Sequence, residues 1–393
     1  MYLIGEQEIE AVRRVINSGR MFRYLDETGE TYEFEKAWSE KIGVKHTIAV
    51  TSGTAALICC LVGLEIGPGD EVIVPAYTFM ATALAPLAVG AVPIIAEVDE
   101  SLTIDPADVE RKITPRTRAI IPVHMNGFPS NMDAIMAIAR KHNLAVVEDA
   151  CQADGGSYKG KRLGSIGDAG AFSFNYYKII TCGEGGAVVT NDPDIHDRAR
   201  IHHDGGCVFF EPTRELRVPF FAGWNFRMNE VLSAILRVQL GRLEDILSAL
   251  RADKRLLMDE LADEEAFTFN PINDRDGDCA TTLGLLFDSV VHANDFMARM
   301  TEQGVGLGSP INSGRHVYCN WEPILKQCGA HHPGRDAFKL TPVPVSYSPD
   351  MCPNSLSALA RTVFVSTSPS RSPDDASKLV AAIKRAAAAP VLV

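Results

Sequence analysis

From about residue 47 to residue 190, short apolar segments alternate with segments that have helical spacing. Strands that alternate with helices of about ten to fifteen residues are typical of βαβ units and a mostly parallel sheet. Several of the segments are continuous apolar runs, as expected for strands that helices cover on both faces. The expected strands are 47–50, 71–74, 92–97, 119–123, 145–148, 169–174 and 186–190. The pattern therefore predicts an α/β fold.

Helical spacing appears within this region and on both sides of it. The expected helices are 6–18, 31–42, 78–89, 132–142, 229–251 and 374–388. A chain of 393 residues usually forms more than one domain. The long helix 229–251 separates the well-patterned first part from a second part with weaker patterns. We therefore expect a large domain over residues 1–250 and a smaller α+β domain over residues 251–393.

Charge and cysteine content bear on the class of protein. The chain has 38 Lys and Arg against 50 Asp and Glu, a formal net charge of −12. Nucleic-acid binders and polybasic membrane binders need a positive field, so we expect neither kind of partner. The nine cysteines show no paired CxxC spacing. This disfavours a disulfide framework or a zinc ribbon and indicates a reducing cytoplasm.

Two segments bear on localisation. The first residues, MYLIGEQEIEAVRRV, carry acids where a signal peptide has an apolar run, so we do not expect secretion. Residues 77–96 are twenty uncharged residues, the length of a membrane span, but Pro86, Gly90 and Pro93 interrupt them. We expect a buried helix, a turn and a buried strand there, and a cytoplasmic protein without a membrane partner.

The strongest chemical signal is Lys178, within SFNYYKIITCGEGG at residues 173–186. It stands in a neutral, aromatic stretch that reaches to Glu184. Apolar surroundings favour the uncharged form of an amine, which is the nucleophile that forms a Schiff base. The alternative is a surface lysine beside a hairpin turn, with its charged end in water.

Two further signals lie at ends of expected strands. Asp149 closes the strand in VVEDACQ and, in an open α/β sheet, lies where ligands bind; the alternative is a helix N-cap. The sequence TSGTAAL at 51–57 places hydroxyls and backbone N–H groups at a helix start, which suits a phosphate. It lacks the lysine of a Walker loop and the spacing of a dinucleotide fingerprint, and its alternative is an ordinary cap. A reactive lysine, an acid and a phosphate cradle together match the needs of pyridoxal 5′-phosphate.

These residues lie in motifs that resemble those of the DegT/DnrJ/EryC1/StrS family of sugar aminotransferases. The motifs are TSGTAAL, GDEVIVPAYTF, PVHMNG, EDACQADGGSYKGKRLGSIGDAGAFSF, YYKIITCGEGGAVVTND and GWNFRMNE. The resemblance covers residues 5–250 clearly and the remainder loosely. It implies fold type I of the pyridoxal phosphate enzymes, the aspartate-aminotransferase fold. MFRY at 21–24, ITCGEGGAV and the EDACQA…GGSYKG run are most similar to the subgroup that makes an 8-amino-3,8-dideoxy-octulosonate sugar.

The resemblance implies roles for the cofactor site. Lys178 would form the internal aldimine and move a proton between the substrate carbon and the cofactor, and Asp149 would pair with the pyridine nitrogen. Gln152 would lie near the ring or its 3-hydroxyl, and Phe79 would stack on the ring. The phosphate would be held by Ser52, Gly53, Thr54 and Ser173.

The resemblance also implies a homodimer with shared active sites, because Asn225 in WNFR would reach the phosphate bound by the neighbouring subunit. The candidates for substrate contact are His124, Tyr177 and Arg315. For His124 a satisfied histidine at a strand end is an equal alternative, and for Arg315 the alternative is a solvated loop. We expect no metal site, since His202-His203-Asp204 lacks a further ligand at helical spacing.

Three departures from the family pattern bear on the substrate. Asn175 stands where the family often has His, and Asp154 replaces the His of the common AQAHG. The segment that begins HVYCNWEPILKQCG at residue 316 departs most, in a region that commonly contacts substrate. Lys178 is retained, unlike in the dehydratase branch of the family, where a His takes its place.

The sequence therefore predicts an enzyme that moves an amino group from glutamate or glutamine to a keto or aldehydo sugar, with pyridoxamine phosphate as intermediate. An 8-oxo-3,8-dideoxy-octulosonate is one possible acceptor. The alternatives are a pyridoxal phosphate enzyme that acts on a cyclitol ketone or catalyses a non-transaminating reaction, and a non-catalytic regulator of the same fold.

Overall fold

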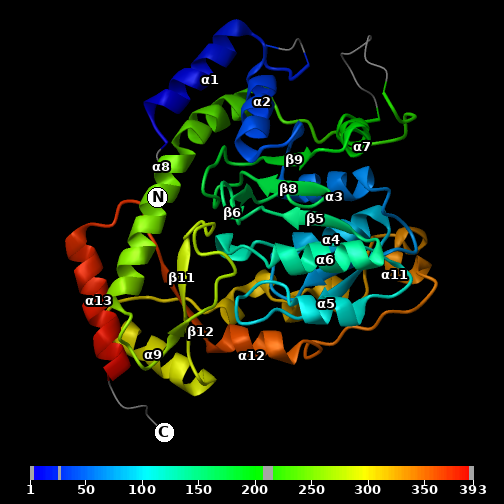
Figure 1. The fold of residues 1–393 in the computed structure, drawn as a ribbon. Coiled ribbons are helices and arrows are strands. Elements are labelled where there is room, and N and C mark those ends of the chain that lie inside the picture. Colours follow the sequence, from blue (N-terminus) through cyan, green and yellow to red (C-terminus); the bar gives the residue numbers. More distant parts are fainter. Residues whose placement is uncertain (1–3, 25–27, 207–215, 389–393) are drawn as a thin grey trace.

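A computed structural model describes residues 4–24, 28–206 and 216–388 (Figure 1). Its centre is a seven-stranded sheet with the strand order β1-β9-β8-β5-β4-β2-β3. The strands are β1 (His46–Val50), β2 (Glu71–Pro75), β3 (Val92–Ala96), β4 (Thr117–Ile120), β5 (Ala145–Asp149), β8 (Ala169–Ser173) and β9 (Gly186–Thr190). All the strands expected from the sequence are present, with ends that differ by at most three residues.

The sheet is mostly parallel, as predicted. The pairs β2–β3, β2–β4, β4–β5 and β5–β8 are parallel. The strand β9 lies antiparallel between β1 and β8, so one edge of the sheet has mixed direction. This edge carries the end of β8, after which Lys178 follows in the chain.

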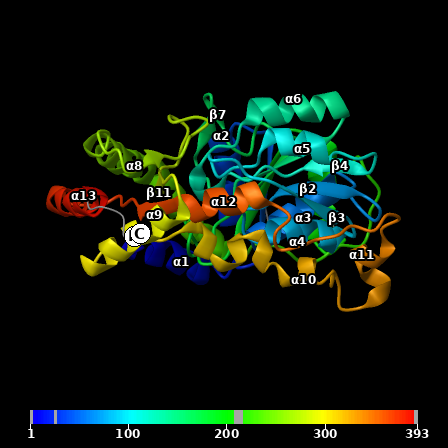
Figure 2. The same ribbon diagram turned by 90° about the horizontal axis from the view of Figure 1, so that it is seen from below.

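Helices cover both faces of the sheet (Figure 2). One hydrophobic cluster joins the sheet to α3 (Gly53–Gly63), α4 (Ala81–Val89) and α7 (Pro193–His203). A second cluster joins the opposite face to other helices: α2 (Glu30–Ile42), α5 (Pro106–Lys112), α6 (Met132–His142) and α8 (Glu230–Glu260). Both faces are therefore buried, which explains the continuous apolar strands. The helix α1 (Glu6–Ser18) packs against α8.

The second part of the chain builds a three-stranded antiparallel sheet with its own hydrophobic cluster. Its elements are β10 (Thr268–Phe269), β11 (Thr282–Leu286), β12 (Thr362–Ser366), α9 (Val290–Glu302) and α13 (Pro373–Ala388). The helix α12 (Pro353–Arg361) adjoins them but buries Ala358 and Leu359 in the first cluster. The segment with α10 (Glu322–Leu325) and α11 (Ala337–Leu340) instead packs against the first cluster of the large sheet. A small hairpin, β6 (Ser157–Tyr158) and β7 (Lys161–Arg162), completes the strands.

Two expected helix boundaries are wrong. The helix expected at 78–89 begins at Ala81, because residues before it bond to the segment around residue 316 instead. The amide of Thr78 donates to the carbonyl of His316 at 2.9 Å, and that of Met80 to Arg315 at 3.1 Å. The helix expected at 229–251 continues as α8 to Glu260, so the expected domain boundary at residue 250 lies inside a helix.

The uncharged stretch 77–96 contains α4, a turn at Gly90 and β3, the arrangement that the sequence predicted. No helix in the described ranges combines the length and the apolar character needed to cross a membrane.

Candidate active site

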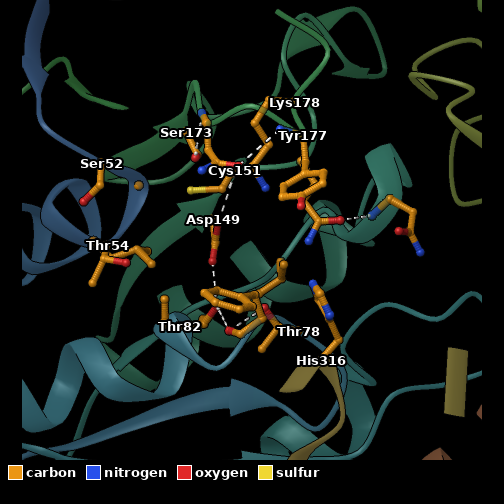
Figure 3. Close-up of a pocket in the computed structure, with 18 of the residues that line it drawn as sticks. Ser52, Thr54, Thr78, Thr82, Asp149, Cys151, Ser173, Tyr177, Lys178 and His316 are labelled. Atoms are coloured by element: carbon orange, nitrogen blue, oxygen red, sulfur yellow. Dashed lines mark hydrogen bonds between the residues drawn. The ribbon is translucent and has the colours of Figure 1, made fainter. Parts of the chain in front are cut away.

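A cavity of about 550 Å³ opens where β5 and β8 end (Figure 3). Asp149 is the last residue of β5 and Ser173 the last of β8, and both line it. The cavity brings together nine of the residues predicted from the sequence: Ser52, Gly53, Thr54, Phe79, Asp149, Gln152, Ser173, Tyr177 and Lys178. These residues come from four separate segments of the chain, 52–54, 79, 149–152 and 173–178, so only the fold makes them neighbours.

Asp149 is held from two sides. Its Oδ2 accepts a hydrogen bond from Thr82 Oγ1 at 2.7 Å, and its Oδ1 accepts one from the amide of Cys151 at 3.1 Å. The side chain is nearly buried but still lines the cavity. A carboxylate with this support is fixed in orientation and suited to hold a proton on a ring nitrogen.

Lys178 lies in a short loop between β8 and β9, and hydrogen bonds join the two ends of this loop. Asn175 and Gly183 form a bridge, and the amide of Lys178 donates to the carbonyl of Asn175 at 2.9 Å. The side chain of Asn175 accepts from the amide of Tyr177 at 3.2 Å and donates to Glu184 at 3.1 Å. The loop therefore places Lys178 at the cavity by local bonds, as Figure 3 shows.

The N-terminus of α3 forms another part of the cavity wall. Ser52 is the N-cap and accepts a hydrogen bond from the amide of Ala55 at 3.1 Å. The alternative interpretation of TSGTAAL as an ordinary helix cap is therefore also correct. A Cβ on Gly53 would lie 2.8 Å from both Cys151 Sγ and Ser173 Cβ. Only glycine fits there, and its backbone faces the cavity with the positive end of the helix dipole.

Two further predicted residues occupy defined places. Gln152 accepts from the amide of Asn126 at 3.1 Å, which fixes its amide group at the wall. The ring of Phe79 is 46% exposed and lies 5.4 Å from the ring of His316. Phe79 thus presents an uncovered aromatic face at the cavity.

Three predicted residues do not line this cavity. His124 is fully buried instead: its Nδ1 accepts from the amide of Ser130 at 3.1 Å and its Nε2 donates to Glu148 at 3.1 Å. Of the pair 315–316, it is His316 and not Arg315 that lines the wall. Asn225 pairs with Asp204 in a bridge and does not line the cavity of its own chain.

Sequence reasoning missed several lining residues, among them Thr78, Thr82, Asn126, Cys151, Glu184 and Thr281. Four of them, Thr78, Asn126, Cys151 and Glu184, lie inside the quoted motifs, so those motifs already contained the signal. Thr82 comes four residues after Thr78 and donates to Asp149, a contact that no local pattern indicates. Thr281 comes from the second part of the chain and donates to the carbonyl of Asn126 at 2.6 Å.

Burial sets the electrostatics of two groups at the cavity. It raises the pKa of the Cys151 thiol well above its ordinary value, with the charge of Asp149 acting in the same direction. Burial also lowers the pKa of His316, so this ring is favoured in its neutral form. Within the described ranges, no group of three or more His, Cys, Asp and Glu side chains gathers as a metal site.

The family model of the DegT/DnrJ/EryC1/StrS aminotransferases matches residues 3–314. The chain belongs to this family. GDP-perosamine synthase of Caulobacter vibrioides is 46% identical over 218 residues, which are 55% of this chain and 58% of that protein. The dTDP-3-amino-3,4,6-trideoxy-alpha-D-glucose transaminase of Streptomyces venezuelae is 42% identical over 236 residues, 60% of either chain. These alignments thus span less than two thirds of the curated relatives.

A solved structure extends the comparison to nearly the whole chain. S. venezuelae DesV, determined in complex with a ketimine intermediate, superposes with a TM-score of 0.80 at 29% identity. The match covers 98% of this chain and 95% of that chain. The predicted family and fold type I are therefore confirmed.

The cavity fits pyridoxal phosphate, the cofactor implied by the DegT/DnrJ/EryC1/StrS family. The start of α3, where Ser52, Gly53 and Thr54 line the cavity, suits a phosphate. The fixed carboxylate of Asp149 suits the ring nitrogen, and the amine of Lys178 lies at the same cavity for the carbonyl carbon.

Proposed function

We propose that this protein is a pyridoxal-phosphate-dependent aminotransferase that moves an amino group from glutamate or glutamine to a keto or aldehydo sugar. The observation that carries the proposal is the convergence of Lys178, Asp149 and the Gly53 turn on one cavity. Membership of an aminotransferase family supports the same reaction. The retained Lys178 favours amination over the dehydratase branch.

Each of these residues would have a separate task. The start of α3 and Ser173 would hold the phosphate, and Asp149 would hold a proton on the ring nitrogen. When bound, pyridoxal phosphate supplies the electron sink that stabilises negative charge at the substrate carbon. The amine of Lys178 would hold the carbonyl carbon covalently and later move the proton to and from the substrate carbon. Phe79 would cover one face of the ring and exclude water there.

The identity of the substrate that accepts the amino group is the more specific part of the proposal. Curated relatives are named for GDP- and dTDP-linked sugars, and another, at 35% identity, for an aminated scyllo-inosose. We propose a sugar acceptor, with 8-oxo-3,8-dideoxy-octulosonate included because of the motif similarity described above. A keto cyclitol is the second candidate, since the cofactor residues would serve it equally.

We further propose a cytoplasmic homodimer with shared active sites. Asn225 supports it, because this residue lies outside the cavity of its own chain. A dimer would let Asn225 complete the phosphate site of the partner.

The test is amination by purified protein loaded with pyridoxal phosphate. Glutamate or glutamine is offered with GDP- and dTDP-linked 4-keto sugars, the 8-oxo octulosonate and keto cyclitols, and products are identified by mass. An aminated sugar is expected with the native protein and none with the Lys178→Ala variant. Amination of cyclitols alone would support the second candidate. A protein that binds no cofactor, shown by the absence of the aldimine absorbance band, would support a non-catalytic regulator.

A further inference from the structure

A second cavity, of about 400 Å³, adjoins the cofactor cavity. Asn126 and His316 line both cavities, so they stand where the two meet. Tyr77, which follows β2 of the large sheet, also lines the second cavity, together with Met297 of α9 and Phe364 of β12. A molecule that extends from the cofactor cavity into the second one therefore contacts both parts of the chain.

The second cavity has an uncharged lining. Among the residues that the structure describes, its apolar lining consists of methionine, leucine, proline and phenylalanine side chains, and its polar lining of hydroxyl, amide and imidazole groups. Burial lowers the pKa of His316, and the charge of Lys178 acts in the same direction, so the imidazole is neutral. An anion enclosed here would lack an opposing charge, which is costly. A group that carries hydroxyls on a C–H framework would find partners of both kinds.

Asn126 and His316 each offer an open acceptor atom. The Nδ1 of His316 donates to the carbonyl of Ser313 at 3.1 Å, so Nε2 of the neutral ring is an acceptor. The Nδ2 of Asn126 donates to the hydroxyl of Tyr77 at 3.3 Å, and Oδ1 is its acceptor atom. Neither Nε2 nor Oδ1 has a hydrogen-bond partner among the described residues. Figure 3 shows the ring of His316 pointing into the cofactor cavity.

The backbone holds Asn126 in place. Its φ is 55°, in the left-handed region that few residues other than glycine and asparagine adopt. The amide of Asn126 donates to Gln152 Oε1 at 3.1 Å, and its carbonyl accepts from Thr281 Oγ1 at 2.6 Å. Such a conformation persists where surrounding contacts fix it, and it is concentrated at functional sites. The amide group of Asn126 is thus fixed at the junction of the two cavities.

We propose that the second cavity is a subsite for the part of the acceptor that lies beyond its carbonyl carbon, and that this part is an uncharged group with several hydroxyls. Asn126 Oδ1 and His316 Nε2 accept hydrogen bonds from these hydroxyls, while the apolar side chains cover the C–H surface. Any phosphate or carboxylate of the acceptor lies outside the subsite. The subsite rests on the proposed function, because it concerns the acceptor of the same reaction.

The first test fills the second cavity and follows the two half-reactions separately. Gly308 lines this cavity, and a Cβ on it would meet nothing within 4 Å, so Gly308→Phe adds a ring to open space. We expect the KM for the acceptor that gives product in the amination test above to rise about tenfold or more. The donor should still convert the bound cofactor, which its absorbance reports. Gly306→Phe is the matched control, because Gly306 is equally open but does not line the cavity.

Two further substitutions test the chemistry of the subsite. His316→Phe keeps a ring but removes the Nε2 acceptor. A site built to bind a hydroxyl loses affinity without its partner, so we expect the KM for the acceptor to rise about tenfold, with a smaller change in kcat. Asn312→Lys adds a cation to the lining of the second cavity. If the bound group is uncharged, this cation does not lower the KM.

Three results would overturn the subsite: a native KM in folded Gly308→Phe or His316→Phe protein, an equal loss of the donor half-reaction in Gly308→Phe, or a KM that falls about tenfold in Asn312→Lys. Folding is judged by circular dichroism, and if Gly308→Phe does not fold, His316→Phe decides by the same two readouts. Native protein that leaves the cofactor unchanged with either donor would instead refute the proposed function. The donor half-reaction therefore distinguishes the two failures.

Discussion

Thr82 and Asp149 are joined by a hydrogen bond of 2.7 Å between the hydroxyl at the start of α4 and the carboxylate at the end of β5. Thr82 also bonds to Thr78 at 2.7 Å, and its side chain is nearly fully buried. The hydroxyl thus belongs to a chain of contacts that orients the carboxylate before any ligand arrives.

Replacing Thr82 by Val tests this orientation. Valine has the same shape but cannot donate, and a hydrogen bond to a charged group contributes about 1.5–3 kcal/mol. We expect affinity for pyridoxal phosphate to fall by about tenfold or more, measured by absorbance titration of cofactor-free protein. Thr82→Ser keeps the hydroxyl and should bind nearly as the native protein does. Equal binding by the two variants would contradict a role for the hydroxyl.

Gly53→Ala tests the proposed phosphate cradle. The added methyl would lie 2.8 Å from Cys151 Sγ and Ser173 Cβ, so the start of α3 must shift. Such overpacking typically costs about 1–3 kcal/mol, and we expect phosphate and cofactor binding to be lost together. Gly241→Ala in α8 is the control, because a Cβ there meets nothing within 4 Å and alanine favours a helix. Binding by calorimetry and stability by thermal unfolding would show the contrast.

A buried ion pair should stabilise the wall that carries Thr281. Lys254 of α8 pairs with Asp278, both nearly buried, and its amine lies 4.7 Å from the ring centre of Phe128. Lys254→Met leaves the carboxylate unpaired, which typically costs about 3–5 kcal/mol. Chemical unfolding would measure this loss. Lys159→Met removes the exposed partner of Asp133 and should change stability far less.

Shared active sites predict complementation between two inactive variants. Lys178→Ala lacks the reactive amine, and Asn225→Ala would lack the group offered to the partner. In mixed dimers one site would carry both changes and the other none, so co-refolded protein should recover about a quarter of native activity. Each variant refolded alone is the control. No recovery, with mixed dimers shown by mass spectrometry, would contradict sharing.

His203 should make the protein sensitive to acid. Burial, aided by Arg23, lowers its pKa well below the ordinary value, while Tyr24 donates to its Nε2 at 2.8 Å. As the pH falls below about 6.5, the unfolded chain takes up a proton that the folded protein refuses, and stability is lost at up to about 1.4 kcal/mol per pH unit. His203→Gln keeps an acceptor and should flatten this slope in urea unfolding. His142→Gln, at the surface, should not.

The strands of the large sheet were predictable because burial on both faces leaves continuous apolar runs. The direction of β9 was not, since its residues read alike in either direction and only its neighbours β1 and β8 fix it. The length of α8 was underestimated because its final turns bury Leu257 in the cluster of the three-stranded sheet, a contact made with residues far along the chain.

The cofactor residues were predictable because they follow strand ends, where the chain must turn toward the cavity. His124 shows the limit of that reasoning. It also follows a strand, but the carboxylate of Glu148 draws its ring into the interior. Thr281 and Thr82 reach the cavity through tertiary contacts that no local pattern contains.

Helix α8 has 31 residues, so it is about 46 Å long at a rise of ~1.5 Å per residue. It buries Leu243 and Leu247 in one cluster and Leu257 in another. Proteases cleave most readily in unstructured segments, but residue 250 lies inside a folded helix. Cleavage within α8 would disrupt both hydrophobic clusters at once. We therefore expect limited proteolysis to degrade the large sheet and the three-stranded sheet together, without a stable fragment of either.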